Sequence, residues 1–321
     1  MDDSPRPSVT VIISAYTERR WPLLSAAVAS VRRQSPPPDE IIVCVDHNPD
    51  LLGACRREWP GTADGDGPPV RCVASRYPGH LGAARTTGVE SASGEVVLFL
   101  DDDAVAEDGW LQRMVAGLMP PSVVAVGGAP QPDYERPRPR WFPFEFDWVF
   151  GCAYAGLPTV PGPVARVIGA AMAARRCDLL AIGGFHSDDL DDLDMSHRLQ
   201  ARFPERVIMY EPGARVSHRV HAERLTWSYF WHRCFRVNRG KAQMLRMLGG
   251  AGNLAAERRF AGRTVTSGTL RCLREAATGD VGGLQRLAAM WAGLGLAALG
   301  YAVGSLELTG PPRSRMRQGT E

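Results

Sequence analysis

The sequence lacks several features that would assign it to a common class. Its seven cysteines are scattered and include no Cys-x-x-Cys pair, so neither a metal finger nor a disulfide framework is indicated. We expect them to be free thiols in a reducing cytoplasm. The N-terminus has no apolar core, so we expect no signal peptide there. What is present, 321 residues of 45% hydrophobic content, fits one large globular domain or two modest ones.

The two signs of charge nearly cancel, at a net charge of +2, but they are unevenly distributed. From residue 201 onward there are about 19 Lys/Arg against 8 Asp/Glu, whereas residues 1–200 hold about 18 against 27. An acidic front half suits metal binding, and a basic tail suits an anionic surface. The high ratio of arginine to lysine hints at a GC-rich bacterial genome.

Strands and helices alternate through the first half of the chain. Apolar, β-branched runs predict strands at 8–14, 40–45, 70–74, 96–100 and 123–128. Helical spacing predicts helices at 22–35, 51–59, 82–92 and 110–119. This alternation predicts an α/β fold with a doubly wound, mostly parallel sheet flanked by helices. Further on, residues 167–174 are apolar, and we expect short strands at 207–210 and 214–217 and helices at 176–182 and 195–202.

One of these strands ends in three adjacent carboxylates. The run 96–100 is followed directly by Asp101, Asp102 and Asp103. Ligand sites in open α/β sheets lie beyond the carboxyl ends of the strands, and three neighbouring acids do not all stay ionised without a cation. A divalent metal shared with a phosphate explains the pattern. A solvated acidic turn is the alternative.

Five motifs follow one another in residues 8–200. They are Ser14-Ala15-Tyr16 and Asp46 at strand ends, the helix start at 80–85, the acids at 101–103, and Asp191-Asp192-Leu193-Asp194 before a helix. Their order and spacing resemble the family 2 glycosyltransferases, which have the nucleotide-sugar-binding GT-A fold. The resemblance covers about two thirds of the chain and is most specific at 94–103 and 183–198.

The resemblance implies a metal-dependent, inverting transfer of a sugar from a nucleotide-sugar, with UDP as the favoured nucleotide. It places Asp102 at the ribose and Asp103 on a Mn²⁺ or Mg²⁺ ion that bridges the phosphates. Tyr16 offers a flat face to a pyrimidine, and Asp46 an acceptor for its imide N–H. The residues assigned to the nucleotide are Ser14, Tyr16, Asp46, Arg85, Asp101 and Asp102. Departures from the family pattern beside Tyr16 and Asp46 leave the nucleotide's identity open.

The resemblance also implies a catalytic carboxylate. Asp192 matches the family's catalytic aspartate and is the candidate general base, with Asp191 as the fallback. Acids that favour a helix dipole are the alternative for this stretch. Gly169 and Ala170 resemble the family's small-residue segment beneath the donor sugar. His218 is expected to complete the metal shell, with His221 as a rival, and a purely structural histidine is the alternative.

The alternation of strands and helices breaks after residue 128. Residues 130–163 are rich in proline and aromatics, among them Trp141 and Trp148, and form either a lid packed on the sheet or a contact for the donor sugar or acceptor. A basic helix is predicted at 227–247 and another helix at 264–280. The uncharged run 287–306 has the length of a bilayer span, but Ala and Gly insert weakly, so we expect a buried or interfacial helix.

The expected organisation is therefore a GT-A catalytic domain at 1–225 and a helical extension at 226–321. The nucleotide-sugar half would be about 1–128 and the acceptor half about 129–225. We expect a cytoplasmic enzyme, with peripheral contact between its C-terminal region and the inner face of the cell membrane. No nucleic-acid partner is expected, because no nucleic-acid fold signature accompanies the basic and aromatic residues at 227–236.

Three questions stay open at this stage. The acceptor is a glycan, a lipid-linked sugar or a natural product. A nucleotidyltransferase of sugar phosphates is an alternative function, although it would normally have a glycine-rich, basic loop after the first strand, which this chain lacks. A non-catalytic sugar-binding protein on the same fold is the other alternative.

Overall fold

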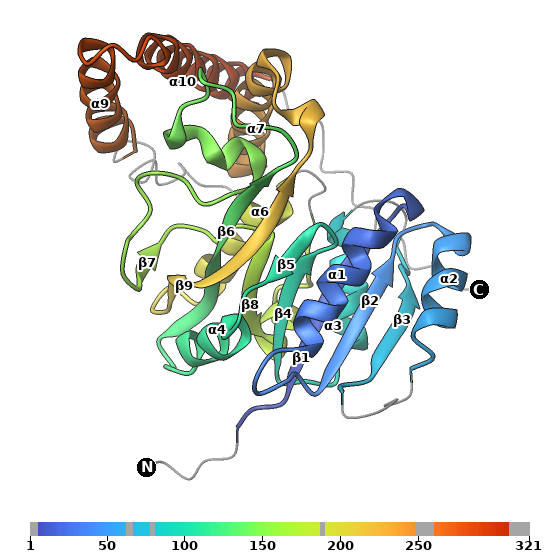
Figure 1. The fold of residues 1–321 in the computed structure, drawn as a ribbon. Coiled ribbons are helices and arrows are strands. Elements are labelled where there is room, and N and C mark those ends of the chain that lie inside the picture. Colours follow the sequence, from blue (N-terminus) through green and yellow to red (C-terminus); the bar gives the residue numbers. More distant parts are fainter. Residues whose placement is uncertain (1–5, 62–66, 78–80, 187–189, 248–259, 308–321) are drawn as a thin grey trace. The chain divides into compact units, whose positions relative to one another are not determined.

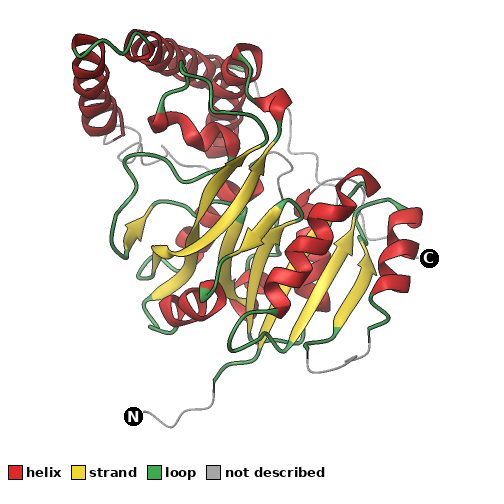
Figure 2. Ribbon diagram, in the orientation of Figure 1, coloured by secondary structure: helices red, strands yellow, loops and turns green. Residues whose placement is uncertain are grey.

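The computed structural model describes residues 6–61, 67–77, 81–186, 190–247 and 260–307 (Figure 1). The chain divides into two compact units. The first consists of residues 1–138 and 146–224, and the second of residues 139–145 and 225–321. Every described strand lies in the first unit, and the second is built from helices (Figure 2).

A nine-stranded mixed sheet forms the centre of the first unit. Its order is β3-β2-β1-β4-β8-β6-β9-β5, and β7 also pairs with β9. Pairs among β1 to β4 are parallel, whereas β8 runs antiparallel to both its neighbours. The strands are β1 (Val9–Ala15), β2 (Glu40–Val45), β3 (Val70–Ala74), β4 (Val96–Asp101), β5 (Ala104–Ala106), β6 (Val123–Tyr134), β7 (Gly162–Val164), β8 (Ala171–Arg175) and β9 (Val207–Val220). The predicted α/β fold class is confirmed.

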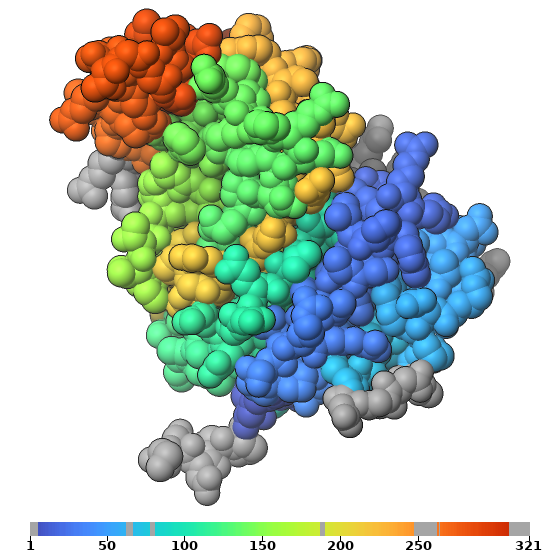
Figure 3. Space-filling view, viewed as in Figure 1, coloured from blue at the N-terminus to red at the C-terminus, as the bar shows by residue number. Residues whose placement is uncertain are grey.

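Helices cover both faces of this sheet because its strands are apolar on both sides. Side chains of α1, α2 and α4 pack with Val11 and Ile13 in one core, and side chains of α3, α5 and α6 pack with Ile12 and Phe99 in the other. These helices are α1 (Trp21–Arg32), α2 (Pro49–Glu58), α3 (Leu81–Ser91), α4 (Trp110–Leu118), α5 (Arg176–Ala181) and α6 (Asp191–Arg202). In the space-filling view the N-terminal residues, coloured blue, form one closely packed surface (Figure 3).

One predicted break in the sheet is wrong. The segment 211–213, Glu-Pro-Gly, suggested a gap between two short strands, but β9 runs through it as one strand. Its pairing with β6 shifts register there, from Tyr210 opposite Gly127 to Arg215 opposite Ala129. An irregularity of this kind accommodates a proline, which has no N–H to donate to a sheet ladder.

The second unit consists mainly of three helices, α7 (Trp227–Met247), α9 (Thr266–Ala277) and α10 (Gly282–Leu306), with a π-helical turn at Phe260–Val265. Two glycines allow α10 to approach α7 closely. An added Cβ at Gly300 would collide with the Phe235 carbonyl, and one at Gly304 with the Arg239 carbonyl. The segment 139–145 belongs to this unit, where Trp141 stacks on Trp227 with ring centroids 3.8 Å apart.

Candidate active site

A pocket of about 230 Å³ lies at the carboxyl ends of β1 and β2. It is lined by Ser14, Ala15, Tyr16, Asp46, Leu81 and Ala84. The parallel pairing of the two strands brings their ends to one edge, where the Asp46 amide donates to the Ala15 carbonyl at 2.8 Å. Ser14 Oγ is buried and has no hydrogen-bond partner among the described residues. The predicted residues Ser14, Tyr16 and Asp46 therefore meet in one pocket, and its buried hydroxyl is available to a polar ligand.

The rim of this pocket is held by Asn48, which caps α2. Its side chain accepts from the Leu51 amide at 3.0 Å and donates to the Tyr16 carbonyl at 3.1 Å. The Tyr16 ring is 54% exposed, and the Asp46 carboxylate contacts His47 Nδ1 at 2.5 Å. The rim thus presents a flat aromatic face beside a carboxylate.

The acids that follow β4 lie close to His218 of β9. Antiparallel pairing places Ala104 of β5 opposite His218. His218 Nε2 is 3.3 Å from Asp103 Oδ1 and 3.8 Å from Asp101 Oδ2, and one ligand atom from each of the three residues falls within 4.8 Å of the others. Two carboxylates and an imidazole form a donor set that suits Mn²⁺.

Two buried polar atoms beside this cluster also have no hydrogen-bond partner among the described residues. They are Asp102 Oδ2 and His221 Nε2, and the latter lies 3.8 Å from Asp103 Oδ2. Buried polar atoms are rarely left unpaired. The residues around Asp103 therefore fit a bound cation.

Burial and neighbouring charges shift the pKa values of Asp102 and Asp103 in opposite directions. Burial raises the pKa of Asp102 to about 7, against the opposing effect of Arg20. Burial also acts to raise the pKa of Asp103, but hydrogen bonding to His218, with the charges of His218 and Arg20, lowers it to about 2. Although burial acts to lower the pKa of His218, contact with Asp103 in turn raises it. Asp103 is thus ionised, as a metal-binding carboxylate must be, whereas His218 must release a proton before it can bind a metal ion.

Arg20 belongs to the same cluster, and the sequence analysis did not identify it. Its Nη1 lies 2.8 Å from Asp102 Oδ1 and 3.1 Å from Asp103 Oδ2, and its guanidinium carbon is 5.2 Å from the centroid of the Tyr16 ring. Arg20 ends a short 3₁₀ turn at Glu18–Arg20, which Thr17 caps. The available signal was the pair Arg19-Arg20, close after the first strand.

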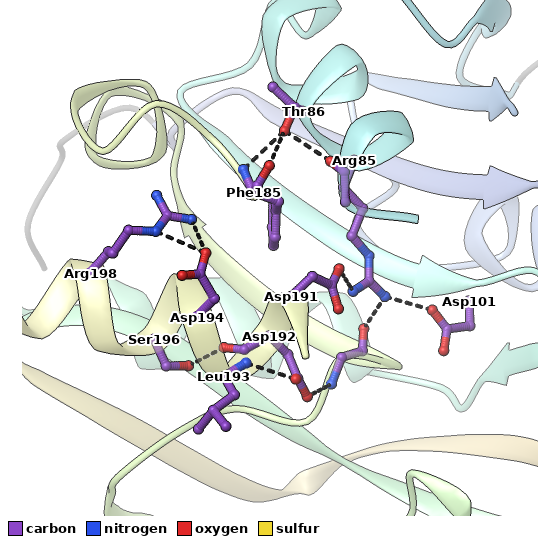
Figure 4. A network of polar contacts seen from close by, with 12 residues as sticks. Arg85, Thr86, Asp101, Phe185, Asp191, Asp192, Leu193, Asp194, Ser196 and Arg198 are labelled. Carbon is purple, nitrogen blue, oxygen red and sulfur yellow. Dashed lines mark hydrogen bonds and ion pairs between the residues drawn. The ribbon is translucent and has the colours of Figure 1, made fainter. Parts of the chain in front are cut away.

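The neighbouring acids Asp191 and Asp192 at the start of α6 lie in two different environments (Figure 4). Asp191 is buried and accepts a hydrogen bond from Arg85 Nη1 at 2.5 Å, and burial raises its pKa to about 6 in spite of that arginine. Asp192 is only partly buried, and its carboxylate accepts from the amides of Gly169, at 3.0 Å, and Leu193, at 2.7 Å. Asp192 therefore has the more accessible carboxylate of the two.

Arg85 joins these two groups of acids. Its side chain, in a residue that is 2% exposed, donates to Asp101 Oδ1 at 2.8 Å and to the Gly169 carbonyl at 2.9 Å, in addition to Asp191 (Figure 4). The predicted contact of Arg85 with a base or phosphate stays a prediction. The observed contacts connect the end of β4, the segment before β8 and the start of α6.

The remaining predicted residues lie in different parts of the chain. Ala170 is buried just before β8. Trp148 is in the first unit, with its ring 5.7 Å from that of Phe146, whereas Trp141 is in the second unit. Their predicted contact with sugar or acceptor stays a prediction. His80, at the start of the motif 80–85, lies outside the described residues.

The chain resembles known proteins along most of its length. A family profile, Glycosyl transferase family 2, matches residues 10–184. A glucosyl-dolichyl phosphate glucuronosyltransferase of Haloferax volcanii is 29% identical over 237 residues, which are 71% of this chain and 74% of that protein. A pre-mycofactocin glycosyltransferase of Mycobacterium tuberculosis is 30% identical over 154 residues, 45% of this chain and 31% of that one.

Two solved structures share the fold. The mannosyltransferase PcManGT from Pyrobaculum calidifontis, in complex with GDP-Man and Mn²⁺, superposes with a TM-score of 0.62 at 20% identity, covering 94% of this chain and 88% of that one. GalNAc-T7 with UDP, GalNAc and Mn²⁺ superposes with a TM-score of 0.54 at 16% identity, covering 80% and 54%. At these identities, the two comparisons show the fold of the chain and nothing more.

Proposed function

The chain belongs to glycosyl transferase family 2 and is a glycosyltransferase, and on this premise we propose that it moves a sugar from a nucleotide-sugar to an acceptor hydroxyl by metal-dependent, inverting displacement. The observation that carries the proposal is the position of Asp103 and His218 at the same sheet edge as the pocket of Ser14, Tyr16 and Asp46. Asp192 connects to this edge through Gly169 and Arg85. The proposal thus has a place for the nucleotide, the metal and the base.

The donor in this proposal is a UDP-sugar. Tyr16 would stack on the uracil, Asp46 would accept from its imide N–H, and Ser14 Oγ would bond within the same pocket. Asp102 would bond the ribose. Solved relatives hold GDP-Man or UDP, so the test must compare nucleotides directly.

Asp103 and His218 would hold a Mn²⁺ or Mg²⁺ ion, with Asp101 in support. When bound, such an ion neutralises charge on the leaving nucleoside diphosphate. Arg20 would contact the same diphosphate, because its guanidinium lies between Tyr16 and the two acids. An arginine suits this role since its planar fork matches phosphate oxygens.

Asp192 would take the proton from the acceptor hydroxyl. The amides of Gly169 and Leu193 hold its carboxylate in one orientation, which is what proton transfer to a positioned base requires. Asp191 is engaged by Arg85 and would support the arrangement. A single base suffices for a single displacement, so no covalent enzyme intermediate is expected.

The acceptor in this proposal is a lipid-linked sugar at a membrane surface. The relative from Haloferax volcanii is named for a glucosyl-dolichyl phosphate. In this chain α10 is long and apolar enough to cross a membrane, and it exposes Leu284, Trp291, Leu299 and Leu306. Residues 225–321 contain 14 Lys/Arg against five Asp/Glu. An apolar helix in a basic unit suits the surface of an anionic bilayer.

Thermal unfolding in the presence of nucleotides tests the donor and the metal together. UDP, GDP and dTDP would each be added with Mn²⁺, Mg²⁺ or EDTA, and at a hundred times its dissociation constant a ligand adds about 2.7 kcal/mol to the free energy of unfolding. We expect a rise in Tm with UDP that requires metal. A rise in Tm with GDP alone would mean that the donor is a GDP-sugar and not a UDP-sugar. If no nucleotide raises Tm, the proposal is overturned.

A further inference from the structure

The thiol of Cys152 contacts the proposed metal ligand His218, and this contact has no part in the proposed transfer reaction. We propose that Cys152 is a positioning residue, which holds the His218 imidazole so that Nε2 faces Asp103. The inference rests on the proposed metal-dependent function and deepens it. Cys152 is one of the seven cysteines that the sequence analysis expected to be free thiols.

His218 lies within hydrogen-bonding distance of both Cys152 and Asp103. Cys152 Sγ is 3.5 Å from His218 Nδ1, and His218 Nε2 is 3.3 Å from Asp103 Oδ1. Cys152 is 0% exposed and His218 is 4% exposed, so water does not substitute readily for either contact. The ring is thus held from both sides, by sulfur at one nitrogen and carboxylate at the other.

The backbone around Cys152 ties the thiol to the strand that carries His218. The Cys152 amide donates to the Asp147 carbonyl at 3.2 Å, and the next residue, Ala153, donates to the Pro130 carbonyl at 2.8 Å. Pro130 lies on β6, which pairs with β9, the strand of His218. Cys152 therefore has a defined position relative to His218.

The chemistry of a histidine ligand explains why this contact matters. An imidazole binds a metal through one unprotonated nitrogen, and in the neutral ring the other nitrogen carries the proton. If Nε2 is the ligand atom, Nδ1–H needs an acceptor, and the thiol sulfur lies in that position. Partners of this kind fix the tautomer and the ring orientation, and their loss typically weakens metal binding 10- to 100-fold.

A nucleophilic role for the thiol is the competing interpretation, because the order of groups resembles a Cys-His-Asp triad. The thiol is fully buried, and a single displacement forms no bond to the enzyme. The positioning role is therefore the one that the geometry favours. It predicts that an apolar residue of similar size at position 152 leaves catalysis intact once the metal is bound.

The test compares the Mn²⁺ affinity of the full-length chain and its variants, measured as free Mn²⁺ by electron paramagnetic resonance. Cys152→Ala and Cys152→Val both remove the acceptor, and Val refills the space. The matched control is Cys55→Ala, which removes an equally buried thiol on α2. Asp103→Ala is the control for loss of the metal site itself.

We expect both Cys152 variants to bind Mn²⁺ 10- to 100-fold more weakly than the wild type, and Cys55→Ala to bind it equally well. The Mn²⁺ concentration for half-maximal turnover should rise by the same factor, while kcat at saturating Mn²⁺ stays within about threefold. Cys152→Ser, which restores an acceptor, should recover part of the affinity. A general loss of structure would instead lower kcat at every Mn²⁺ concentration.

The outcomes separate this inference from the proposed function. If Asp103→Ala loses Mn²⁺ and the Cys152 variants bind it like Cys55→Ala, the positioning role is overturned and the metal site stands. If the wild type binds no Mn²⁺, the metal-dependent function is overturned, and this inference with it. If kcat of Cys152→Val falls more than 100-fold at saturating Mn²⁺, the thiol takes part in the chemistry and the positioning role is wrong.

Discussion

Replacing Asp192 with Asn tests the proposed base with little change of shape. A positioned general base typically contributes 10²- to 10⁴-fold to the rate. At 1.36 kcal/mol per factor of ten, the barrier should rise by about 2.7 to 5.4 kcal/mol. Donor binding should stay within about threefold, because in the proposal the metal and the nucleotide pocket hold the donor.

The structure also predicts the effect of this substitution on stability. The Asp192 carboxylate accepts from the amides of Gly169 and Leu193. An Asn amide has one oxygen, so one of these two N–H groups would face an NH₂ group instead. A hydrogen bond lost at a partly buried site costs about 1–3 kcal/mol, so Tm should fall modestly.

The assay measures release of nucleoside diphosphate from the donor, with donor affinity measured separately by calorimetry. Asp194→Asn is the matched control, since Asp194 is on the same turn but pairs with Arg198 at 2.5 Å. We expect Asp194→Asn to lower Tm and to keep its turnover per folded molecule. Turnover of Asp192→Asn within threefold of the wild type would refute the assignment of the base.

Three further substitutions address the other parts of the site. Arg85→Lys should lower Tm and turnover together, because one ammonium group replaces a guanidinium that bonds two carboxylates and a carbonyl. Breaking a buried ion pair costs about 3–5 kcal/mol, which is the upper limit for this variant. An unchanged Tm would contradict this account. Arg20→Ala should weaken UDP binding about tenfold, because a hydrogen bond to a charged group contributes about 1.5 kcal/mol, which is about a tenfold change in the dissociation constant. Its Mn²⁺ affinity should be equal or tighter, because the variant removes a cation 3.1 Å from Asp103, and weaker Mn²⁺ binding in calorimetry would contradict this account. Trp291→Glu changes a residue on α10 that is 53% exposed. The variant should co-sediment less with anionic vesicles and should keep the UDP-induced rise in Tm. Co-sedimentation equal to that of the wild type would argue against α10 as the membrane contact.

Local patterns were sufficient for the α/β fold class and for the site residues at strand ends, but they did not predict the strands β5 and β7. Runs of apolar residues mark β1, β2 and β4, and parallel strands present their carboxyl ends at one edge. Ser14, Asp46 and Asp101 were therefore expected at one edge of the sheet, and the observed strand order β2-β1-β4 makes their strands neighbours. The same local reasoning failed at 211–213, where β9 continues through an irregularity because the residues on both sides of it pair with β6.

The contacts between distant segments were decided by tertiary structure alone. Which histidine faces Asp103 depends on the register of β5 against β9, and a shift of one residue would turn His218 to the other face of the sheet. The positions of Arg20, Arg85 and Cys152 depend likewise on side chains from separate elements meeting in a desolvated core. Local residue patterns were enough to identify the family, the fold class and the acids at the strand ends. The partners that orient those acids become neighbours only on folding, because they are close in space and not along the chain.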